Sequence, residues 1–248
     1  NRFIVMPALM IAVFSGCMTT SGPSAKLQSI EIAQTHAAVK PVPRADNEGW
    51  MARHNSFNVN AAKGDYDLLM IGDSITHGWE GHGKEVWAQY YGDRKALNLG
   101  IGGDRTEHVL WRLDNGNVDG LTPKAAVIMI GTNNHNDNTA EEIAEGIIAI
   151  VQNLNAKMPE MNILILGIFP RYAEANHPKR IMLAEASRIA STIADGKRIH
   201  YLDIADAFLT ADGTLTKEIM PDFLHPQAKG YAIWAEAMEP KLKELLGE

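Results

Sequence analysis

Residues 67–75 read Asp-Leu-Leu-Met-Ile-Gly-Asp-Ser-Ile, in which four apolar side chains are followed at once by a glycine and two polar residues. A continuous apolar run of this length predicts a strand buried on both faces, as in a parallel sheet covered by helices. The Gly72-Asp73-Ser74 sequence after it predicts a sharp turn from strand to helix, with Ser74 on the turn. Because such turns are common, this stretch alone indicates a fold and no function.

Strand-like and helix-like patterns alternate outward from this stretch over residues 48–248. Such alternation predicts one α/β domain with right-handed crossovers and an open parallel sheet. Capping boxes at Asp104/Glu107 and Thr139/Glu142 predict the starts of two helices. The other expected helices are residues 50–62, 85–91, 181–194 and one that opens at Pro226, and the expected strands are residues 67–71, 96–99, 125–130, 163–168 and 199–202.

Polar residues from four separate segments are expected to meet at one edge of this sheet. Ligands of open parallel sheets bind beyond the carboxyl ends of the strands, and Ser74, Gly103 and Asn133 each follow a predicted strand. Asp222 and His225, three residues apart, lie before the last helix. A serine, a histidine and an aspartate are the parts of a hydrolytic triad. Without Ser74, the Asp/His pair would be read as a cap of that helix.

These segments resemble the four sequence blocks of the SGNH hydrolases, also called GDSL esterases. The blocks are residues 72–75, 98–106, 131–135 and 222–225, and they occur in the family's order. The run on to residue 113 is typical of the subgroup formed by the catalytic subunits of platelet-activating factor acetylhydrolase. The resemblance covers residues 48–246 and implies a three-layer, flavodoxin-like α/β fold with about five parallel strands and helices on both faces.

The resemblance also implies the chemistry, that of a carboxylic ester hydrolase without a cofactor. Ser74 is the implied nucleophile, His225 the base that takes its proton, and Asp222 the carboxylate that orients the imidazole. The tetrahedral oxyanion would be bound by the backbone N–H groups of Ser74 and Gly103 and by the side-chain amide of Asn133.

In this subgroup three bulky residues wall a shallow acyl pocket, and the matching positions here are Ile75, Thr132 and Leu224. The expected substrates are therefore short-chain esters, chiefly O-acetyl groups on small molecules or oligosaccharides. Phospholipid-like acetyl esters are the alternative, and a non-catalytic binding module on the same fold is a second one. Residues 171–177 depart from the family pattern, which leaves the alcohol part of the substrate open.

The first sixteen residues are expected to be a lipoprotein signal peptide, because an apolar stretch too short to span a bilayer ends in Ser15-Gly16-Cys17. Cys17 would then carry a lipid, although a lone cysteine is more often a small buried side chain. Residues 17–47, rich in Ser, Thr, Ala and Pro, are expected to be a flexible tether. This predicts a lipid-anchored protein of the bacterial cell envelope, on its periplasmic or extracellular face.

Composition excludes some classes of partner. The net charge is −7 and no cluster of Lys or Arg is present, which argues against nucleic acid. Cys17 is the only cysteine, so no intrachain disulfide can form. His77, His82, His108 and His135 show no metal-binding spacing, and no metal is expected. Relatives in the subgroup dimerise, which leaves a homodimer open.

Overall fold

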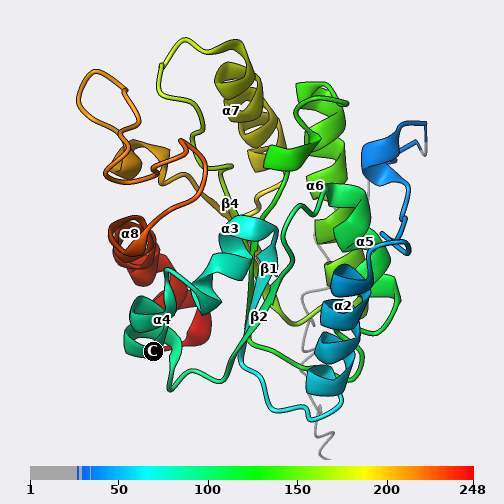
Figure 1. The fold of residues 1–248 in the computed structure, drawn as a ribbon. Coiled ribbons are helices and arrows are strands. Elements are labelled where there is room, and N and C mark those ends of the chain that lie inside the picture. The colour runs from blue at the N-terminus through cyan, green and yellow to red at the C-terminus, as the bar shows by residue number, and fades with distance from the viewer. Residues whose placement is uncertain (1–26, 28–29, 34) are drawn as a thin grey trace, which may run out of the picture.

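The computed structural model describes residues 27, 30–33 and 35–248 (Figure 1). The expected signal peptide and the expected lipidation site, Cys17, lie outside the described residues. Among the residues that are described, no helix is long and apolar enough to cross a membrane.

Five parallel strands form one sheet in the order β2-β1-β3-β4-β5. In this doubly wound order the chain adds β2 on one side of β1 and then β3, β4 and β5 on the other, and ligands bind at such a switch point. The prediction of an α/β fold with a parallel five-stranded sheet is confirmed. The strands are β1 (Leu68–Gly72), β2 (Ala96–Gly100), β3 (Ala125–Met129), β4 (Asn162–Leu166) and β5 (Ile199–Leu202).

Helices cover both faces of the sheet, which gives three layers (Figure 1). Successive strand side chains point to opposite faces, so Leu69 and Ile71 of β1 pack in one core and Leu68 and Met70 in the other. The first core contains α2 (Glu48–Ala61), α5 (Thr106–Asp114), α6 (Ala140–Lys157) and α7 (Pro178–Ser191), and the second contains α3 (Ser74–His77), α4 (Lys84–Tyr91) and α8 (Ala228–Leu246).

Short 3₁₀ helices complete the chain: η1 (Ala37–Val39), η2 (Gly78–Glu80), η3 (Thr132–Asn134) and η4 (Ala205–Phe208). One of them, η1, belongs to the segment expected to be a tether. Ala38 and Val39 are buried, and the carbonyl of Ala38 accepts a hydrogen bond from Thr106 Oγ1 at 2.7 Å. The last part of the expected tether, residues 35–47, therefore packs on α5 and α6, because its small apolar side chains fit between these helices.

One predicted capping box is confirmed and the other is wrong. Thr139 Oγ1 accepts from the Glu142 N–H at 3.2 Å, and the Glu142 carboxylate accepts from the Thr139 N–H at 3.1 Å. At the other site Arg105, not Asp104, is the residue that precedes α5. Asp104 does not cap this helix, because its two carboxylate oxygens accept from the Trp50 indole and from Arg112 instead.

Candidate active site

The turn after β1 places Ser74 at the carboxyl edge of the sheet. Asp73 precedes α3, and its Oδ1 accepts the Ile75 N–H at 2.9 Å, which fixes the start of this short helix. Gly72 permits the turn, because a Cβ there would lie 2.4 Å from the carbonyl oxygen of Met129 on β3. The nucleophile predicted from the sequence thus follows a turn that only glycine can make at its first position.

His225 and Asp222 lie beside Ser74. The Ser74 Oγ and the His225 Nε2 are 2.9 Å apart, and the His225 Nδ1 is 2.6 Å from the Asp222 Oδ2. The other carboxylate oxygen of Asp222 accepts the backbone N–H groups of Leu224 at 3.1 Å and His225 at 2.8 Å. These bonds require a tight turn, and Phe223 within it has a positive φ of 56°. The fold therefore brings together three side chains that are up to 151 residues apart.

The electrostatics of Asp222 suit the role of an orienting carboxylate. Partial burial acts to raise its pKa, but the hydrogen bonds from the side chain and backbone of His225 outweigh this effect and hold the pKa below its usual range. Asp222 is therefore ionised at neutral pH and can hold the Nδ1–H of His225. With that nitrogen protonated, Nε2 is left to accept the proton of Ser74.

Tyr231 links the helix that carries Ser74 to the helix that follows His225. Its hydroxyl on α8 donates to the carbonyl of Ile75 on α3 at 2.7 Å, within the buried core. The helix that follows the His225 segment is thereby tied to the helix that carries the serine.

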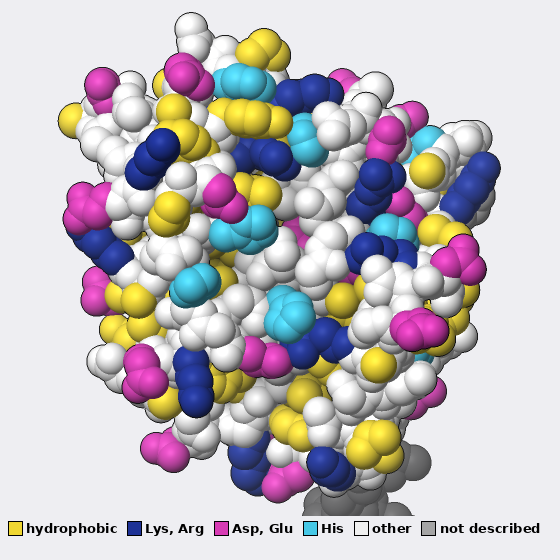
Figure 2. Space-filling view, viewed as in Figure 1, with side chains coloured by type: hydrophobic (Ala, Val, Ile, Leu, Met, Phe, Trp, Pro, Cys, Tyr) yellow, Lys and Arg dark blue, Asp and Glu magenta, His cyan; other side chains and the backbone are white. Residues whose placement is uncertain are grey.

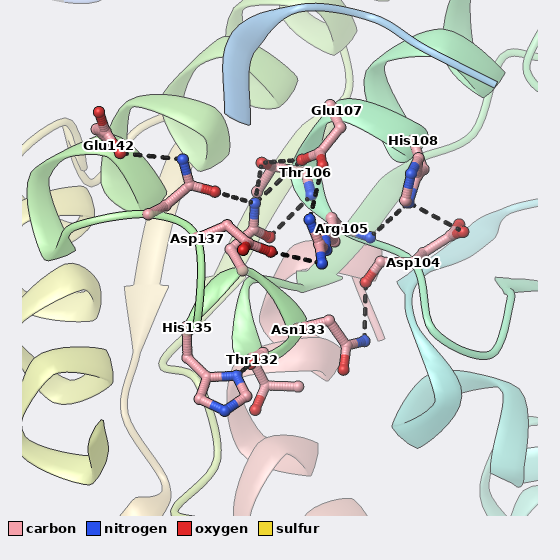
Figure 3. Close-up of polar contacts among 12 residues, drawn as sticks. Asp104, Arg105, Thr106, Glu107, His108, Thr132, Asn133, His135, Asp137 and Glu142 are labelled. Carbon is pink, nitrogen blue, oxygen red and sulfur yellow. Dashed lines mark hydrogen bonds and ion pairs between the residues drawn. The ribbon is translucent and has the colours of Figure 1, made fainter. Parts of the chain in front are cut away.

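Gly103 and Asn133 lie on the loops after β2 and β3. Gly103 has a φ of +77°, in the left-handed region that favours glycine. Asn133, on η3, donates one Nδ2–H to the carbonyl of Asp104 at 2.9 Å (Figure 3). An amide nitrogen carries two hydrogens, so the second N–H of Asn133 remains for a ligand. The structure thus places both predicted oxyanion donors at the same edge as Ser74.

The loop that carries Asn133 is anchored to α5 by its neighbour Asn134. Its Oδ1 accepts the Thr106 N–H at 3.1 Å, and its Nδ2 donates to the buried Glu107 carboxylate at 3.0 Å. Asn134 is fully buried, so this network fixes the loop and with it the position of Asn133.

A buried ion pair includes the last residue of the loop of residues 102–104, called the glycine loop below. Asp104 and Arg112 are both completely buried, and Arg112 Nε donates to the Asp104 carboxylate at 2.9 Å. The Trp50 indole N–H donates to the same carboxylate at 2.6 Å. Burial raises the pKa of Asp104, and the adjacent Arg112 opposes this rise. The expected capping role of Asp104 left this pair unpredicted, because Asp104 lies in the loop before α5 and meets Arg112 only in the folded chain.

The three expected acyl-pocket residues lie next to the triad and its oxyanion donors. Ile75 and Thr132 are buried, and Leu224 is half-buried. The Nη1 of Arg171 donates to the carbonyl and hydroxyl of Thr132 at 3.1 and 3.2 Å. Arg171 therefore fixes one wall of the expected pocket, a contact that the sequence did not predict.

Residues 171–177, which depart from the family pattern, lie at the same edge of the sheet. The rings of Tyr172 and His177 stack with centroids 3.7 Å apart, and the Tyr172 hydroxyl is 3.3 Å from the His135 Nε2. The backbone N–H of Tyr172 donates to the carbonyl of Phe223 in the Asp222–His225 turn at 3.0 Å. Figure 2 shows histidine and basic side chains around the hollow in the middle of this face.

No group of three or more His, Cys, Asp or Glu side chains that could hold a metal ion occurs in the described part of the chain. Two of the histidines considered in the sequence analysis have other partners there. His108 Nδ1 accepts the Arg105 N–H at 3.0 Å, and burial lowers the pKa of His108 to about 4. The His135 Nδ1 is 2.8 Å from the carbonyl of Thr132.

Asp73 should make the stability of the fold depend on pH. It is completely buried, and burial raises its pKa to about 7; Asp104 adds to this rise, while the Ile75 N–H and Arg171 oppose it. The folded-state pKa exceeds the unfolded value of about 3.9, so the neutral carboxyl favours folding below about pH 4. That contribution is lost as pH rises toward 7, at a slope of at most about 1.4 kcal/mol per pH unit.

Urea unfolding at several pH values between 4 and 7.5 measures this effect. Asp73→Asn keeps an oxygen for the Ile75 N–H but cannot ionise, so its free energy of unfolding should fall less over this range than that of the wild type. Parallel pH curves for the two proteins would rule out Asp73 as the source.

Comparison with known proteins identifies the family. The GDSL-like Lipase/Acylhydrolase family model matches residues 70–233. The platelet-activating factor acetylhydrolase IB subunit alpha2 of Rattus norvegicus is 38% identical over 203 residues, covering 82% of this chain and 87% of that protein. The alpha1 subunit of Homo sapiens is 35% identical over 218 residues, covering 87% of this chain and 93% of that protein.

Solved structures share the fold at lower identity. A GDSL-like lipase from Bacteroides thetaiotaomicron superposes with a TM-score of 0.60 at 16% identity, covering 78% of this chain and 98% of that one. An acetylxylan esterase from Geobacillus stearothermophilus gives a TM-score of 0.57 at 20% identity, covering 73% and 94%. The family resemblance predicted from the four sequence blocks is thus confirmed, and the chain belongs to the GDSL-like lipase/acylhydrolase family of carboxylic ester hydrolases.

Proposed function

We propose that this protein is a serine esterase that hydrolyses short-chain esters, chiefly O-acetyl groups, through an acyl-enzyme formed on Ser74. The observation that carries the proposal is the continuous hydrogen-bonded chain from the Ser74 Oγ to the His225 imidazole at 2.9 Å and on to the Asp222 carboxylate at 2.6 Å. These lengths are within the range that proton transfer requires.

The mechanism follows from this chain of contacts. As the Ser74 Oγ attacks the ester carbonyl, its proton passes to the His225 Nε2, and Asp222 stabilises the imidazolium that forms. The oxyanion accepts hydrogen bonds from the N–H groups of Ser74 and Gly103 and from the free N–H of Asn133. The imidazolium then protonates the leaving alcohol. In the second half His225 takes a proton from water, whose oxygen attacks the acyl carbonyl, and the imidazolium gives that proton to the Ser74 Oγ as the acid is released.

The residues around Ser74 bear on the size of the acyl group. Ile75 and Thr132 are buried, and Arg171 holds Thr132 through its hydroxyl and carbonyl. Two side chains held in place beside Ser74 favour a short acyl group. Leu224, half-buried and next to His225, is the wall that a substitution can open with the least effect on the core.

A chain-length series of p-nitrophenyl esters tests the acyl preference. We expect kcat/KM to fall from acetate to butyrate to octanoate, and Leu224→Ala to raise the butyrate-to-acetate ratio by about 10-fold, the lower end of what one methylene is worth in a pocket. Leu202→Ala, at a half-buried leucine of the far edge strand β5, is the matched control and should leave the ratio unchanged. Octanoate hydrolysed faster than acetate by the wild type would defeat the acetyl preference.

The alcohol is proposed to be a carbohydrate. The expected lipid anchor at Cys17 and location in the bacterial envelope favour an acetylated sugar polymer, and the fold is shared with an acetylxylan esterase. The higher sequence identity to the platelet-activating factor acetylhydrolase subunits favours a phospholipid-like acetyl ester as the second candidate. Acetate release from acetylated xylan, compared with release from an acetylated phospholipid at equal ester concentration, separates the two candidate alcohols. A separate experiment, fractionation of cells that carry Cys17→Ser, tests the lipid anchor.

A further inference from the structure

The N-terminal segment of residues 35–47 runs from η1 toward the glycine loop of the active site. Two hydrogen bonds hold it on α5. The carbonyl of Ala38 accepts from Thr106 Oγ1 at 2.7 Å, and the Val42 N–H donates to the Glu107 carbonyl at 3.3 Å. The segment is thereby held at the start of the helix that follows the glycine loop, next to residues 102–104.

Arg44 extends from this segment to the loop itself. Its Nη1 donates to the carbonyl of Gly102 at 2.7 Å. The same nitrogen lies 3.0 Å from the position that a Cβ on Gly103 would occupy, so the guanidinium lies against both glycines. Arg44 is half-buried, and within the described residues it forms no ion pair with a carboxylate. Its charge is therefore not neutralised by a direct partner.

The Gly102 carbonyl and the Gly103 N–H belong to one peptide group. This peptide bond is trans, so its C=O and N–H point in opposite directions. A donor that fixes the direction of the carbonyl therefore also fixes the direction of the N–H. Glycine on both sides leaves this peptide with few steric restraints of its own, which makes an external restraint important here.

The charge on Arg44 adds a second effect. Hydrogen bonds from an ionised donor are about twice as strong as neutral ones, and a hydrogen bond to the carbonyl of a peptide polarises its N–H toward stronger donation. The stabilisation from the charged donor and that from the polarised N–H both increase as negative charge develops on the oxygen bound by the Gly103 N–H. They therefore favour the transition state over the bound ester.

We propose that Arg44 is a positioning residue of the esterase, which orients and polarises the Gly102–Gly103 peptide so that the Gly103 N–H is held ready for the oxyanion. The proposal rests on the function proposed above, in which Gly103 supplies one oxyanion donor. The segment preceding the α/β domain then completes the active site, although it supplies no group that touches the substrate.

The test compares kcat and KM of the full chain with p-nitrophenyl acetate for Arg44→Ala, Arg44→Lys and Lys40→Ala. Losing a whole oxyanion donor costs about 10²–10³ in kcat, so weakening one through Arg44→Ala should lower kcat by about 10- to 100-fold with KM changed by less than about 2-fold. Arg44→Lys keeps a charged donor and should recover most of the loss, as should methylguanidinium added to Arg44→Ala at about 10 mM. Lys40→Ala removes a charge from an exposed side chain of the same segment and should be unchanged.

A purely structural role gives a different pattern. If Arg44 only fastens the segment, Arg44→Ala lowers the melting temperature while kcat of the folded enzyme stays at the wild-type value, and that result overturns the proposal. A loss seen only as a higher KM, or one equally large in Lys40→Ala, also overturns it. If Arg44→Ala does not fold, the kcat of Arg44→Lys is compared with that of Arg44→Gln, since both side chains can donate but only lysine is charged. A higher kcat in Arg44→Lys supports the proposal, and an equal kcat overturns it.

Ser74→Ala separates the two levels of inference. An inactive Ser74→Ala together with wild-type kcat in Arg44→Ala contradicts the role of Arg44 alone. A fully active Ser74→Ala contradicts the proposed function, and the role of Arg44 with it.

Discussion

Replacing Ser74 by alanine is expected to lower kcat on p-nitrophenyl acetate by about 10⁶-fold, the scale known for removal of a nucleophile or base from a serine protease triad. The reason is that Ser74 supplies the only hydroxyl held against the His225 Nε2, at 2.9 Å, in the part of the chain that the structure describes. His225→Ala should cause a loss of the same order, because serine without a base is a weak nucleophile. Steady-state kinetics on purified variants measures both losses.

The double variant provides the sharper check. Residues that act as a unit are strongly non-additive, so Ser74→Ala/His225→Ala should be no slower than either single variant. Ser191→Ala removes an exposed serine hydroxyl at the end of α7 and serves as the control. A reactive organophosphonate should label the wild type and Ser191→Ala but not Ser74→Ala. Loss of less than about 100-fold in Ser74→Ala would show that another group performs the attack.

Replacing Arg112 by methionine is expected to lower the free energy of unfolding by about 3–5 kcal/mol, the cost of leaving one partner of a buried ion pair uncompensated. Arg112 and Asp104 are completely buried and 2.9 Å apart. Arg112 also donates to the Asn117 Oδ1 at 3.0 Å, so the substitution leaves a second buried acceptor with one partner fewer. Urea unfolding followed by circular dichroism measures the change.

Two further variants isolate the cause. Arg188→Met breaks the ion pair of Arg188 with Glu185, which is exposed on α7, and should change stability little, because exposed pairs contribute little. Asp104→Asn/Arg112→Met removes both buried charges but leaves an acceptor for the Trp50 indole, so it should be more stable than Arg112→Met alone. If Arg112→Met is as stable as Arg188→Met, the buried pair does not support the loop.

Much of the fold could be predicted from the sequence, because buried parallel strands are continuous apolar runs. The expected strand of residues 199–202 matches β5, and that of residues 67–71 differs from β1 by one residue at each end. The edge at which the site lies was predictable for the same reason. Ser74, Gly103 and Asn133 follow successive strands, and the carboxyl ends of parallel strands meet at one edge.

Element boundaries were less predictable where a local contact ends an element. The expected strand of residues 163–168 ends at Leu166 in the structure, because the Ile168 N–H donates to the Ser187 Oγ on α7 and not to a neighbouring strand. The helix expected to begin at residue 181 begins at Pro178. A proline at the first helical position is a start signal, and Pro178 is such a signal for α7.

The support around the site could not be predicted, because it depends on side chains that meet only after folding. Arg44 reaches the Gly102 carbonyl across 58 residues of sequence, and it lies in a stretch whose composition is typical of a tether. Arg171 reaches Thr132 across 39 residues from a loop without regular structure. No periodicity or spacing in the sequence relates such residues to each other.

The loop of residues 171–177 has a consequence for how this enzyme can diversify. It contributes none of the groups assigned to bond making or proton transfer, yet Arg171 contacts Thr132 and the Tyr172 backbone contacts the Phe223 carbonyl. Substitutions here would reshape the approach to the serine while the strands that hold the reacting groups stay in place. Relatives that differ only in this stretch would therefore keep the same reacting groups, held by the same strands, beside a differently shaped surface.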